Sequence, residues 1–445
     1  MSRIMTPRTI ARTLGVVAIA NVLFVVLLLL APHDPNRVAS RVRTAFATGD
    51  LGTVEYLKGD IRRGWHQYND CSVLQMLSDH DSSRVAQSLA PRMAFLRTDP
   101  DGNLSCAALR AIALGGVSQD SMAPFRYARY WHGYMIPVAV ALEGMELAAL
   151  RRLLLIAVYA AIALLAIAAF RSSPYTRRTG LAIAGTAALF WAAPYFAPSL
   201  THGPGDAVLV LALGILILRP AMATDLDTLI PYAAGFGAVV VFFEMLTGQL
   251  PIAASWLAAL VLALARDESR PGALDARLRS VAALGAFAIG GVITVAVKQA
   301  LATMFAEPQA GAVFVRKLGA YAGMPAPRNG IPGVFLPYIE LLRHMFVLAG
   351  WNYLAGEVLA AALALALLWA VARGWRQRRT IQGRDVLFLV GLTLIPAVWV
   401  LILPNHTFQH TSFMVRMMVV PISLAVAALV WPSNGQATAA RQERA

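Results

Sequence analysis

A short segment with acidic residues holds the first side chains suited to chemistry. The stretch from Lys58 to Cys71 contains two aspartates, Asp60 and Asp70, and one histidine, His66. A carboxylate beside a bound hydroxyl group acts as a general base, and with other oxygen ligands it holds Mg²⁺ or Mn²⁺ against a phosphate. Asp70 also stands just before the run Ser72 to Leu77, where it fits the N-cap of a helix. The residues leave the catalytic and the capping role of Asp70 open.

A second cluster combines aromatic and basic residues. Between Arg126 and Tyr134 the chain has two arginines, one histidine and four aromatic residues. Aromatic faces provide apolar surfaces for sugar rings, and arginines grip phosphate oxygens in pairs. The same residue types also anchor a helix at a membrane interface, so both interpretations stand. The candidate ligands in this cluster are Arg126, Arg129, Trp131 and His132.

Further cations and histidines follow later in the chain. Lys298 lies near the end of an apolar run, where a lysine ordinarily extends its ammonium group to water. His406 and His410 are four residues apart and would share one helical face, but a zinc site needs a third ligand. Glu244 is ionisable within an apolar run, which makes it a functional candidate. The cations and histidines expected to hold a donor phosphate are Lys298, Arg316, Lys317, Arg343, His406, His410 and Arg416.

The composition decides what kind of molecule must position these residues. Of 445 residues, 58% are hydrophobic and 14% are charged, and the mean hydropathy is +0.61. Soluble domains carry about 25% charged residues. The formal net charge is +14, but the basic residues flank apolar runs, as membrane topology requires, and form no basic groove with interleaved aromatics. The sequence therefore predicts an all-α, multi-pass membrane protein with no nucleic-acid partner.

About ten apolar runs are candidates for membrane helices, since crossing the hydrocarbon core takes about 20 helical residues. The first follows Arg3, Arg8 and Arg12 and has no small-residue cleavage site after it, so we interpret it as a retained signal anchor. Two others, 205–218 and 252–265, are short and are expected to be tilted, broken or buried within the bundle. The runs are 12–31, 152–170, 179–197, 205–218, 229–247, 252–265, 280–303, 355–372, 386–404 and 413–431.

The arginines between these runs are concentrated in every second loop. With a cytoplasmic N-terminus, the short outer loops 198–204, 248–251 and 405–412 contain no Lys or Arg. This asymmetry is typical of the positive-inside rule and places both termini in the cytoplasm of a bacterial inner membrane. The inner loops carry Arg171, Arg177, Arg178, Arg219, Arg270, Arg277, Arg279, Arg373, Arg376, Arg378, Arg379 and Arg384.

The runs divide the chain into six parts. Both cysteines, Cys71 and Cys106, fall in the first outer loop, where a disulfide is favoured over two buried free thiols. We expect this loop to be mainly helical. The parts are 1–31 (cytoplasmic N-terminus and first helix), 32–150 (large periplasmic loop), 151–303 (helices two to seven), 304–354 (second periplasmic loop), 355–431 (helices eight to ten) and 432–445 (cytoplasmic tail).

The layout resembles the GT-C glycosyltransferases, membrane enzymes that take sugars from polyprenyl-phosphate donors. The local likeness lies in Tyr68–Leu74, Arg129–Tyr134 and Asn405–Arg416. The resemblance implies that Asp70 is the catalytic base and that the arginines and histidines bind the lipid phosphate. Many members have a paired acidic motif soon after the first helix, whereas Asp60 and Asp70 are separated here, so Asp60 remains a competitor.

The sequence thus leads to one expected function and two alternatives. The expected function is inverting transfer of a sugar from a polyprenyl-phosphate donor to a glycan, lipid or protein acceptor on the periplasmic face, with a possible divalent cation. A lipid-linked polysaccharide ligase or polymerase would rely on Arg and His instead of an aspartate. A lipid or solute transporter would need charges along its membrane helices, of which the sequence has few.

Overall fold

The structure, a computed structural model, describes residues 6–32, 34–52, 64–97, 105–115, 121–191, 196, 198–244, 246–268, 275–349 and 352–432. The side chains of residues 64–66 and 191 are outside this description. The predicted catalytic alternative Asp60 and the side chain of His66 therefore lie outside the described residues.

Eight stretches of the described chain are helices long and apolar enough to cross a membrane, which is consistent with the predicted mainly helical, multi-pass membrane protein. Two more predicted runs correspond to shorter helices, α8 (Pro174–Thr186), continued by η2 (Ala187–Trp191), and α9 (His202–Leu218), so the count of about ten stays a prediction. The eight stretches are α1 (Pro7–Leu30), α7 (Leu147–Phe170), α11 (Leu226–Phe243), α12 (Gln249–Asp267), α13 (Ala276–Phe305), α17 (Tyr353–Arg376), α18–α19 (Ile381–Leu392 and Leu394–Ile402) and α21–η3–α22 (Thr411–Met414, Val415–Met418 and Val419–Leu429).

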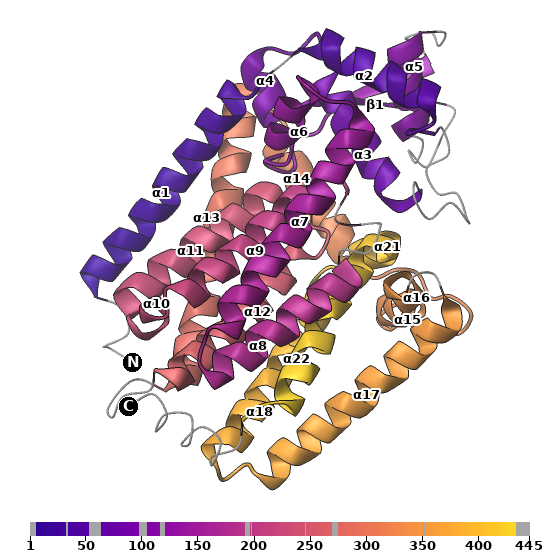
Figure 1. The fold of residues 1–445 in the computed structure, drawn as a ribbon. Coiled ribbons are helices and arrows are strands. Elements are labelled where there is room, and N and C mark those ends of the chain that lie inside the picture. The colour runs from indigo at the N-terminus through magenta and orange to yellow at the C-terminus, as the bar shows by residue number, and fades with distance from the viewer. Residues whose placement is uncertain are drawn as a thin grey trace.

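A smaller unit, here called the cap, lies at one end of the helix bundle and is formed by the described residues between 34 and 142 (Figure 1). Its two strands pair antiparallel, with Arg92 opposite Arg126, and its other described elements are helices, as expected. A disulfide joins Cys71 to Cys106, which confirms the predicted pair and links α3 to α5. The cap elements are α2 (Pro35–Thr48), α3 (Gly64–Leu77), α4 (Arg84–Leu89), β1 (Arg92–Leu96), α5 (Ser105–Leu114), β2 (Met122–Arg126) and α6 (Met135–Leu142).

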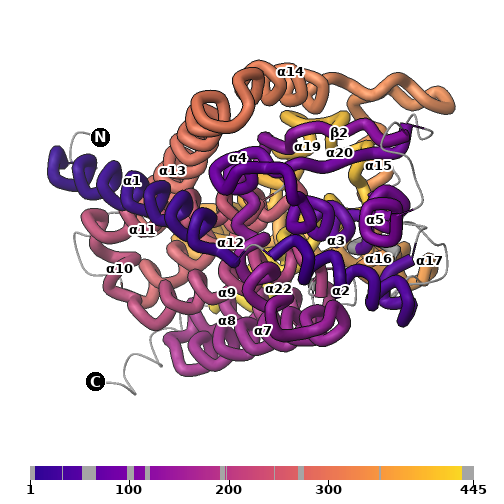
Figure 2. Tube along the Cα trace, turned by 90° about the horizontal axis from the view of Figure 1, so that it is seen from above, coloured from indigo at the N-terminus to yellow at the C-terminus, as the bar shows by residue number. Residues whose placement is uncertain are grey.

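Short helices connect the membrane helices. The predicted second loop folds as α14 (Ala310–Ala322), α15 (Leu336–Arg343) and α16 (Met345–Leu348), and α20 (Pro404–Gln409) precedes α21. Figure 2 shows the chain from above, with α14 beside the cap strands. At the opposite end, α10 (Ala221–Thr224) connects α9 to α11. Segments that are distant in sequence, from the cap, α14 and α20, therefore meet at one end of the bundle.

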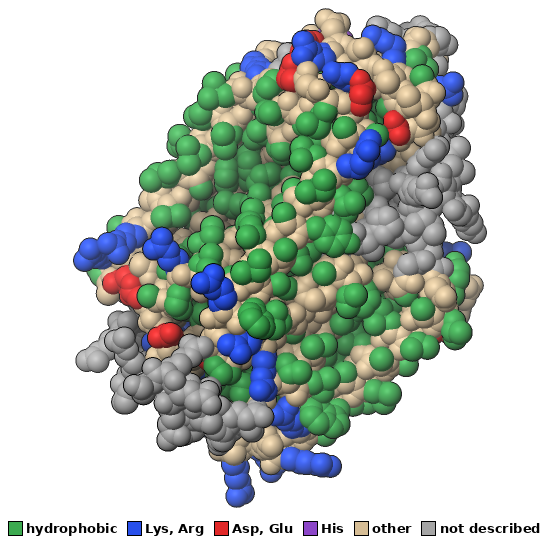
Figure 3. All heavy atoms as spheres, viewed as in Figure 1, with side chains coloured by type: hydrophobic (Ala, Val, Ile, Leu, Met, Phe, Trp, Pro, Cys, Tyr) green, Lys and Arg blue, Asp and Glu red, His purple; other side chains and the backbone are tan. Residues whose placement is uncertain are grey.

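Helix α12 lies at the centre of the bundle. Every residue from Trp256 to Ala263 is completely buried, as expected for a short apolar run enclosed by other helices. The indole Nε1 of Trp256 donates to Ser423 Oγ of α22 at 2.9 Å. By contrast, Leu365 and Leu368 of α17 are 68% and 66% exposed, and Figure 3 shows apolar side chains spread over the middle of the face, with most charged side chains toward its two ends. Such a surface is typical of contact with lipid or with another protein.

Helices α11 and α13 cross at small residues. A methyl group on Gly290 would lie 2.0 Å from the carbonyl oxygen of Ala234, and one on Gly237 would lie 2.1 Å from that of Phe287. Neither contact is possible without moving a helix, because the obstructing atoms belong to the backbone. The two glycines therefore set the distance between these helices, as small residues do in membrane bundles.

This crossing gives a stability prediction. Gly290→Ala is expected to lower the free energy of unfolding by about 1–3 kcal/mol, because α13 must shift away from α11. Gly285→Ala in the same helix is the control, since a methyl group there meets nothing within 4 Å. Thermal unfolding in detergent checks both variants, and equal melting temperatures would contradict the proposed close approach.

Candidate functional site

A small cavity lies where the cap meets the bundle, and we call it the cap cavity. Its volume is about 80 Å³, which is below the size of a typical small-molecule pocket and suits a phosphate group or part of a sugar ring. Three of the predicted clusters contribute to it, together with one tyrosine from α14. It is lined by Tyr68, Asn69, Ser72, Met93, Phe95, Tyr127, Arg129, Tyr130, Thr247, Tyr321, His406, His410 and Phe413.

Arg129 is the cation of the cap cavity. Its guanidinium carbon lies 4.6 Å from the ring centre of Tyr127 and 5.9 Å from that of Tyr130, and it donates a hydrogen bond to the Tyr321 hydroxyl. The aromatic faces stabilise the charge without neutralising it. Burial raises the pKa of Tyr127 to about 12, so this phenol stays neutral beside the arginine. A fixed positive charge among hydroxyl groups is well suited to a phosphate.

The two histidines of the cavity are neutral neighbours. Their ring centres are 4.7 Å apart, and Tyr321 lies 4.4 Å from His406. Burial, with Arg129 contributing, lowers the pKa of His406 to about 3 and that of His410 to about 4. His406 Nε2 lies 2.9 Å from the carbonyl oxygen of Leu246. Because a carbonyl only accepts, Nε2 carries the proton and Nδ1 is left as an acceptor.

Two buried polar atoms at the cavity have no hydrogen-bond partner among the described residues. They are Nδ1 of His406 and Nδ2 of Asn69, on side chains that are 2% and 5% exposed. An unsatisfied buried polar atom costs about 1–3 kcal/mol, and such atoms at a cavity indicate a ligand or water. One is an acceptor and the other a donor, which matches a group bearing both hydroxyls and oxygen acceptors.

Polar side chains connect the cap cavity to Asp70, and we call this series the polar chain. Thr247, which lines the cavity, lies 3.1 Å from His202 Nε2, and His202 Nδ1 lies 3.4 Å from Thr201 Oγ1. Thr201 Oγ1 is 3.0 Å from Ser199 Oγ, which lies 3.4 Å from Asp70 Oδ1. All five residues are buried. Each adjacent pair is within hydrogen-bond distance, so the chain is continuous.

Asp70 is inside α3, so its predicted N-cap role is wrong. Its carboxylate is fully buried and is not part of the cavity lining; Nη2 and Nε of Arg151 of α7 donate to Oδ2 at 2.7 and 2.9 Å. The backbone N–H of Leu200 donates to Oδ1 at 2.8 Å. Burial raises the pKa of Asp70, although Arg151 opposes the shift. Any catalytic role must therefore act through the polar chain, because the carboxylate is not at the cavity.

Four other predicted ligands have structural partners. Arg126 donates to Ser82 Oγ at 2.7 Å, and Trp131 donates to the Thr294 carbonyl at 2.9 Å. His132 is fully buried between Tyr134 and the Tyr127 carbonyl, and burial lowers its pKa to about 3. The ammonium of Lys298 is buried and donates to the carbonyls of Leu89 and Ala128. Lys298 therefore does not extend to water, contrary to the snorkelling explanation.

The remaining predicted residues lie outside the cavity lining. Arg316 and Lys317 are exposed on α14, and the exposed Arg343 pairs with Glu340 at 2.9 Å. Arg416 is fully buried and pairs with Asp206 of α9. Glu244 accepts the N–H groups of Gly248 and Gln249, at the start of α12, at 3.1 and 3.0 Å.

The structure brings together residues that sequence reasoning missed. Asn69 directly precedes Asp70, while Tyr321, Thr247 and His202 come from distant segments with no motif around them. The one usable signal was His202, a histidine in a loop without basic residues. Among the described residues, no group of three or more His, Cys, Asp or Glu side chains is placed to hold a metal ion.

Comparisons of the chain with protein-family models, with curated proteins and with solved structures found no match.

Proposed function

We propose that the chain is a membrane transferase that moves a sugar from a polyprenyl-phosphate donor to a hydroxyl acceptor at the cap cavity. The observation that carries this proposal is the cavity itself, which joins one fixed cation, aromatic faces and unsatisfied polar atoms. With the arginine-rich loops in the cytoplasm, the cap faces the periplasm.

The donor phosphate is assigned to Arg129. Negative charge accumulates on the phosphate as the bond to the sugar breaks, and a fixed cation stabilises that charge most when water is excluded. The Tyr321 hydroxyl, which accepts a hydrogen bond from Arg129, can turn its own proton toward a phosphate oxygen. The rings of Phe95, Tyr127 and Phe413 line the same cavity and offer faces for the sugar.

We assign the removal of the proton from the acceptor hydroxyl to the polar chain. As the acceptor oxygen bonds to the anomeric carbon, its proton passes to Thr247 while Thr247 gives its own to His202 Nε2. His202 releases its Nδ1 proton to Thr201, Thr201 passes one to Ser199, and Ser199 passes one to Asp70 Oδ1. The leaving phosphate departs with the electrons of the broken bond. Burial raises the pKa of Asp70, which favours this final step.

The ligase or polymerase alternative has one observation in its favour. Arg129, His406 and His410 line the cavity, whereas Asp70 does not, and such enzymes would use Arg and His. Transport gains some support too, because the buried pair Asp206–Arg416 adds charges within the bundle that the sequence pattern did not reveal. A ligase or polymerase would use diphosphate-linked donors, so comparing diphosphate donors with monophosphate donors distinguishes it from the proposed sugar transferase.

The decisive experiment measures polyprenyl phosphate released from a panel of polyprenyl-phosphate sugars by the protein in nanodiscs, with a panel of hydroxyl acceptors present to receive the sugar. Wild type is expected to release it, and Arg129→Gln is expected to be slower by about 10²–10³-fold, since one charge-stabilising donor is removed. Arg126→Gln is the matched control, because Arg126 is close in sequence but bonds Ser82. Release only from diphosphate donors would favour the ligase, and no release from either donor would contradict the proposal.

A further inference from the structure

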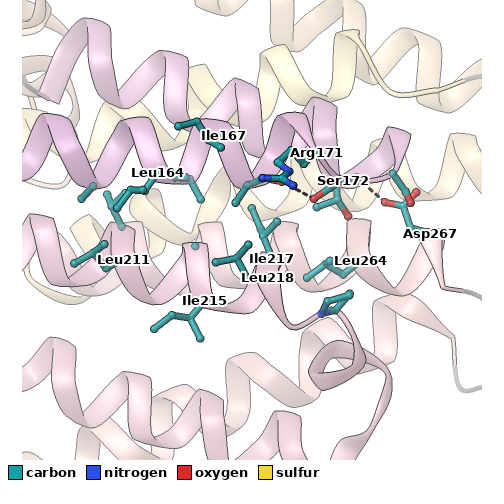
Figure 4. Close-up of a pocket in the computed structure, with 18 of the residues that line it drawn as sticks. Leu164, Ile167, Arg171, Ser172, Leu211, Ile215, Ile217, Leu218, Leu264 and Asp267 are labelled. Atoms are coloured by element: carbon teal, nitrogen blue, oxygen red, sulfur yellow. Dashed lines mark hydrogen bonds between the residues drawn. The ribbon is translucent and has the colours of Figure 1, made fainter.

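A long groove runs between α7 and α9 at the end of the bundle away from the cap. Its volume is about 750 Å³. Leu164 and Ile167 of α7 line it together with Leu211 and Ile215 of α9 (Figure 4). The groove lies within the apolar belt, so in a membrane it opens toward lipid and not toward water.

The shape of the groove suits a single extended hydrocarbon chain. Leu164 and Leu218 form exposed walls, at 56% and 67%, while Leu165 and Ala168 form a buried floor. Gly214 of α9 also lies on the floor, and a methyl group added there would meet nothing within 4 Å. A glycine within a helix is less favourable than an alanine. The missing side chain leaves open space where an acyl chain would lie.

Charges of both signs stand at one end of the groove. Figure 4 places Arg171 and Asp267 together there, and Glu268 follows directly. Arg171 and Glu268 are exposed. The carboxylate of Asp267 accepts the N–H groups of Tyr175 and Thr176 at 3.3 and 2.8 Å, which fixes it beside the start of α8. The polar end therefore presents one cation and two carboxylates.

We propose that this groove binds a zwitterionic glycerophospholipid with a primary ammonium group, its acyl chain over Gly214, its phosphate at Arg171 and its ammonium at Glu268 and Asp267. Arginine holds phosphate well, and carboxylates beside it repel an anionic headgroup. The charge arrangement therefore selects the zwitterionic lipid over an anionic one. The site is separate from the cap cavity and independent of the proposed transferase activity.

Competitive lipid binding tests the proposal. The purified protein in detergent is mixed with equal amounts of phosphatidylethanolamine and phosphatidylglycerol of the same acyl composition, and native mass spectrometry counts the bound lipids. We expect phosphatidylethanolamine to be favoured by about fivefold to tenfold, which corresponds to about 1 kcal/mol. Glu268→Gln is expected to remove this preference, and Arg171→Ala to weaken the binding of both lipids.

A groove-filling variant locates the site. Gly214→Leu is expected to reduce bound phosphatidylethanolamine about tenfold by occupying the floor, whereas Gly285→Leu on α13, also in open space, leaves binding unchanged. Arg152→Ala, at the other end of α7, is the control for Arg171→Ala. Equal binding of the two lipids, detergent alone in the groove, or identical results for both leucine variants would overturn the proposal.

Discussion

Valine in place of Thr247 is expected to slow sugar transfer by about 10²-fold or more, because it breaks the polar chain next to the cap cavity. Valine keeps the size of threonine but has no hydroxyl, so His202 Nε2 loses its partner at 3.1 Å. His202→Phe is expected to have a similar effect, since the ring stays between Phe196 and Phe413 but cannot transfer a proton. Both variants should reduce kcat far more than they change KM.

Thr407→Val is the matched control for this prediction. Thr407 is also buried near the cavity, but its hydroxyl donates only to the Leu403 carbonyl of its own helix turn. The measurement is the rate of polyprenyl phosphate release, with a solvent isotope effect on wild type. If Thr247→Val and Thr407→Val were equally active while wild type transfers sugar, the proton route would be wrong and the transferase proposal would stand.

Arg416→Met is expected to lower the free energy of unfolding by about 3–5 kcal/mol, because it leaves the carboxylate of Asp206 buried without its ion partner. Both side chains are fully buried, and Gln249 Nε2, which donates to Asp206 Oδ1 at 2.8 Å, cannot replace a charge. Replacing both members, in Asp206→Leu with Arg416→Met, is expected to cost less than the sum of the single changes.

Arg343→Met provides the comparison for Arg416→Met. Arg343 pairs with Glu340 at 2.9 Å, but its side chain is 62% exposed, so its loss is expected to cost less than about 1 kcal/mol. Unfolding by denaturant in detergent gives all the values. If Arg416→Met and Arg343→Met were equally stable, the buried pair would not support the bundle as the structure suggests.

The sequence by itself determined the features that depend on local composition. A membrane helix must be apolar over about 20 residues, so hydropathy alone located the spans, including the buried α12. The disulfide was also predictable from the sequence, because both cysteines fall in one segment between two predicted membrane helices. Of the predicted ligands, Arg129, His406 and His410 meet in one cavity, since the aromatic and histidine clusters both lie near helix ends on one side of the membrane.

The tertiary structure alone decided what each polar residue contacts. The sequence around Asp70 predicts a catalytic carboxylate or the N-cap of a helix, but its ion partner Arg151 lies 81 residues farther along the chain. The sequence predicts that Lys298 extends its ammonium group to water. In the structure, backbone carbonyls of the cap accept hydrogen bonds from the buried ammonium group. In each case, burial left a charge with no water to solvate it, so the nearest packed element had to satisfy it. Hydropathy locates a helix along the chain, whereas the partner of a buried charge depends on how the helices pack.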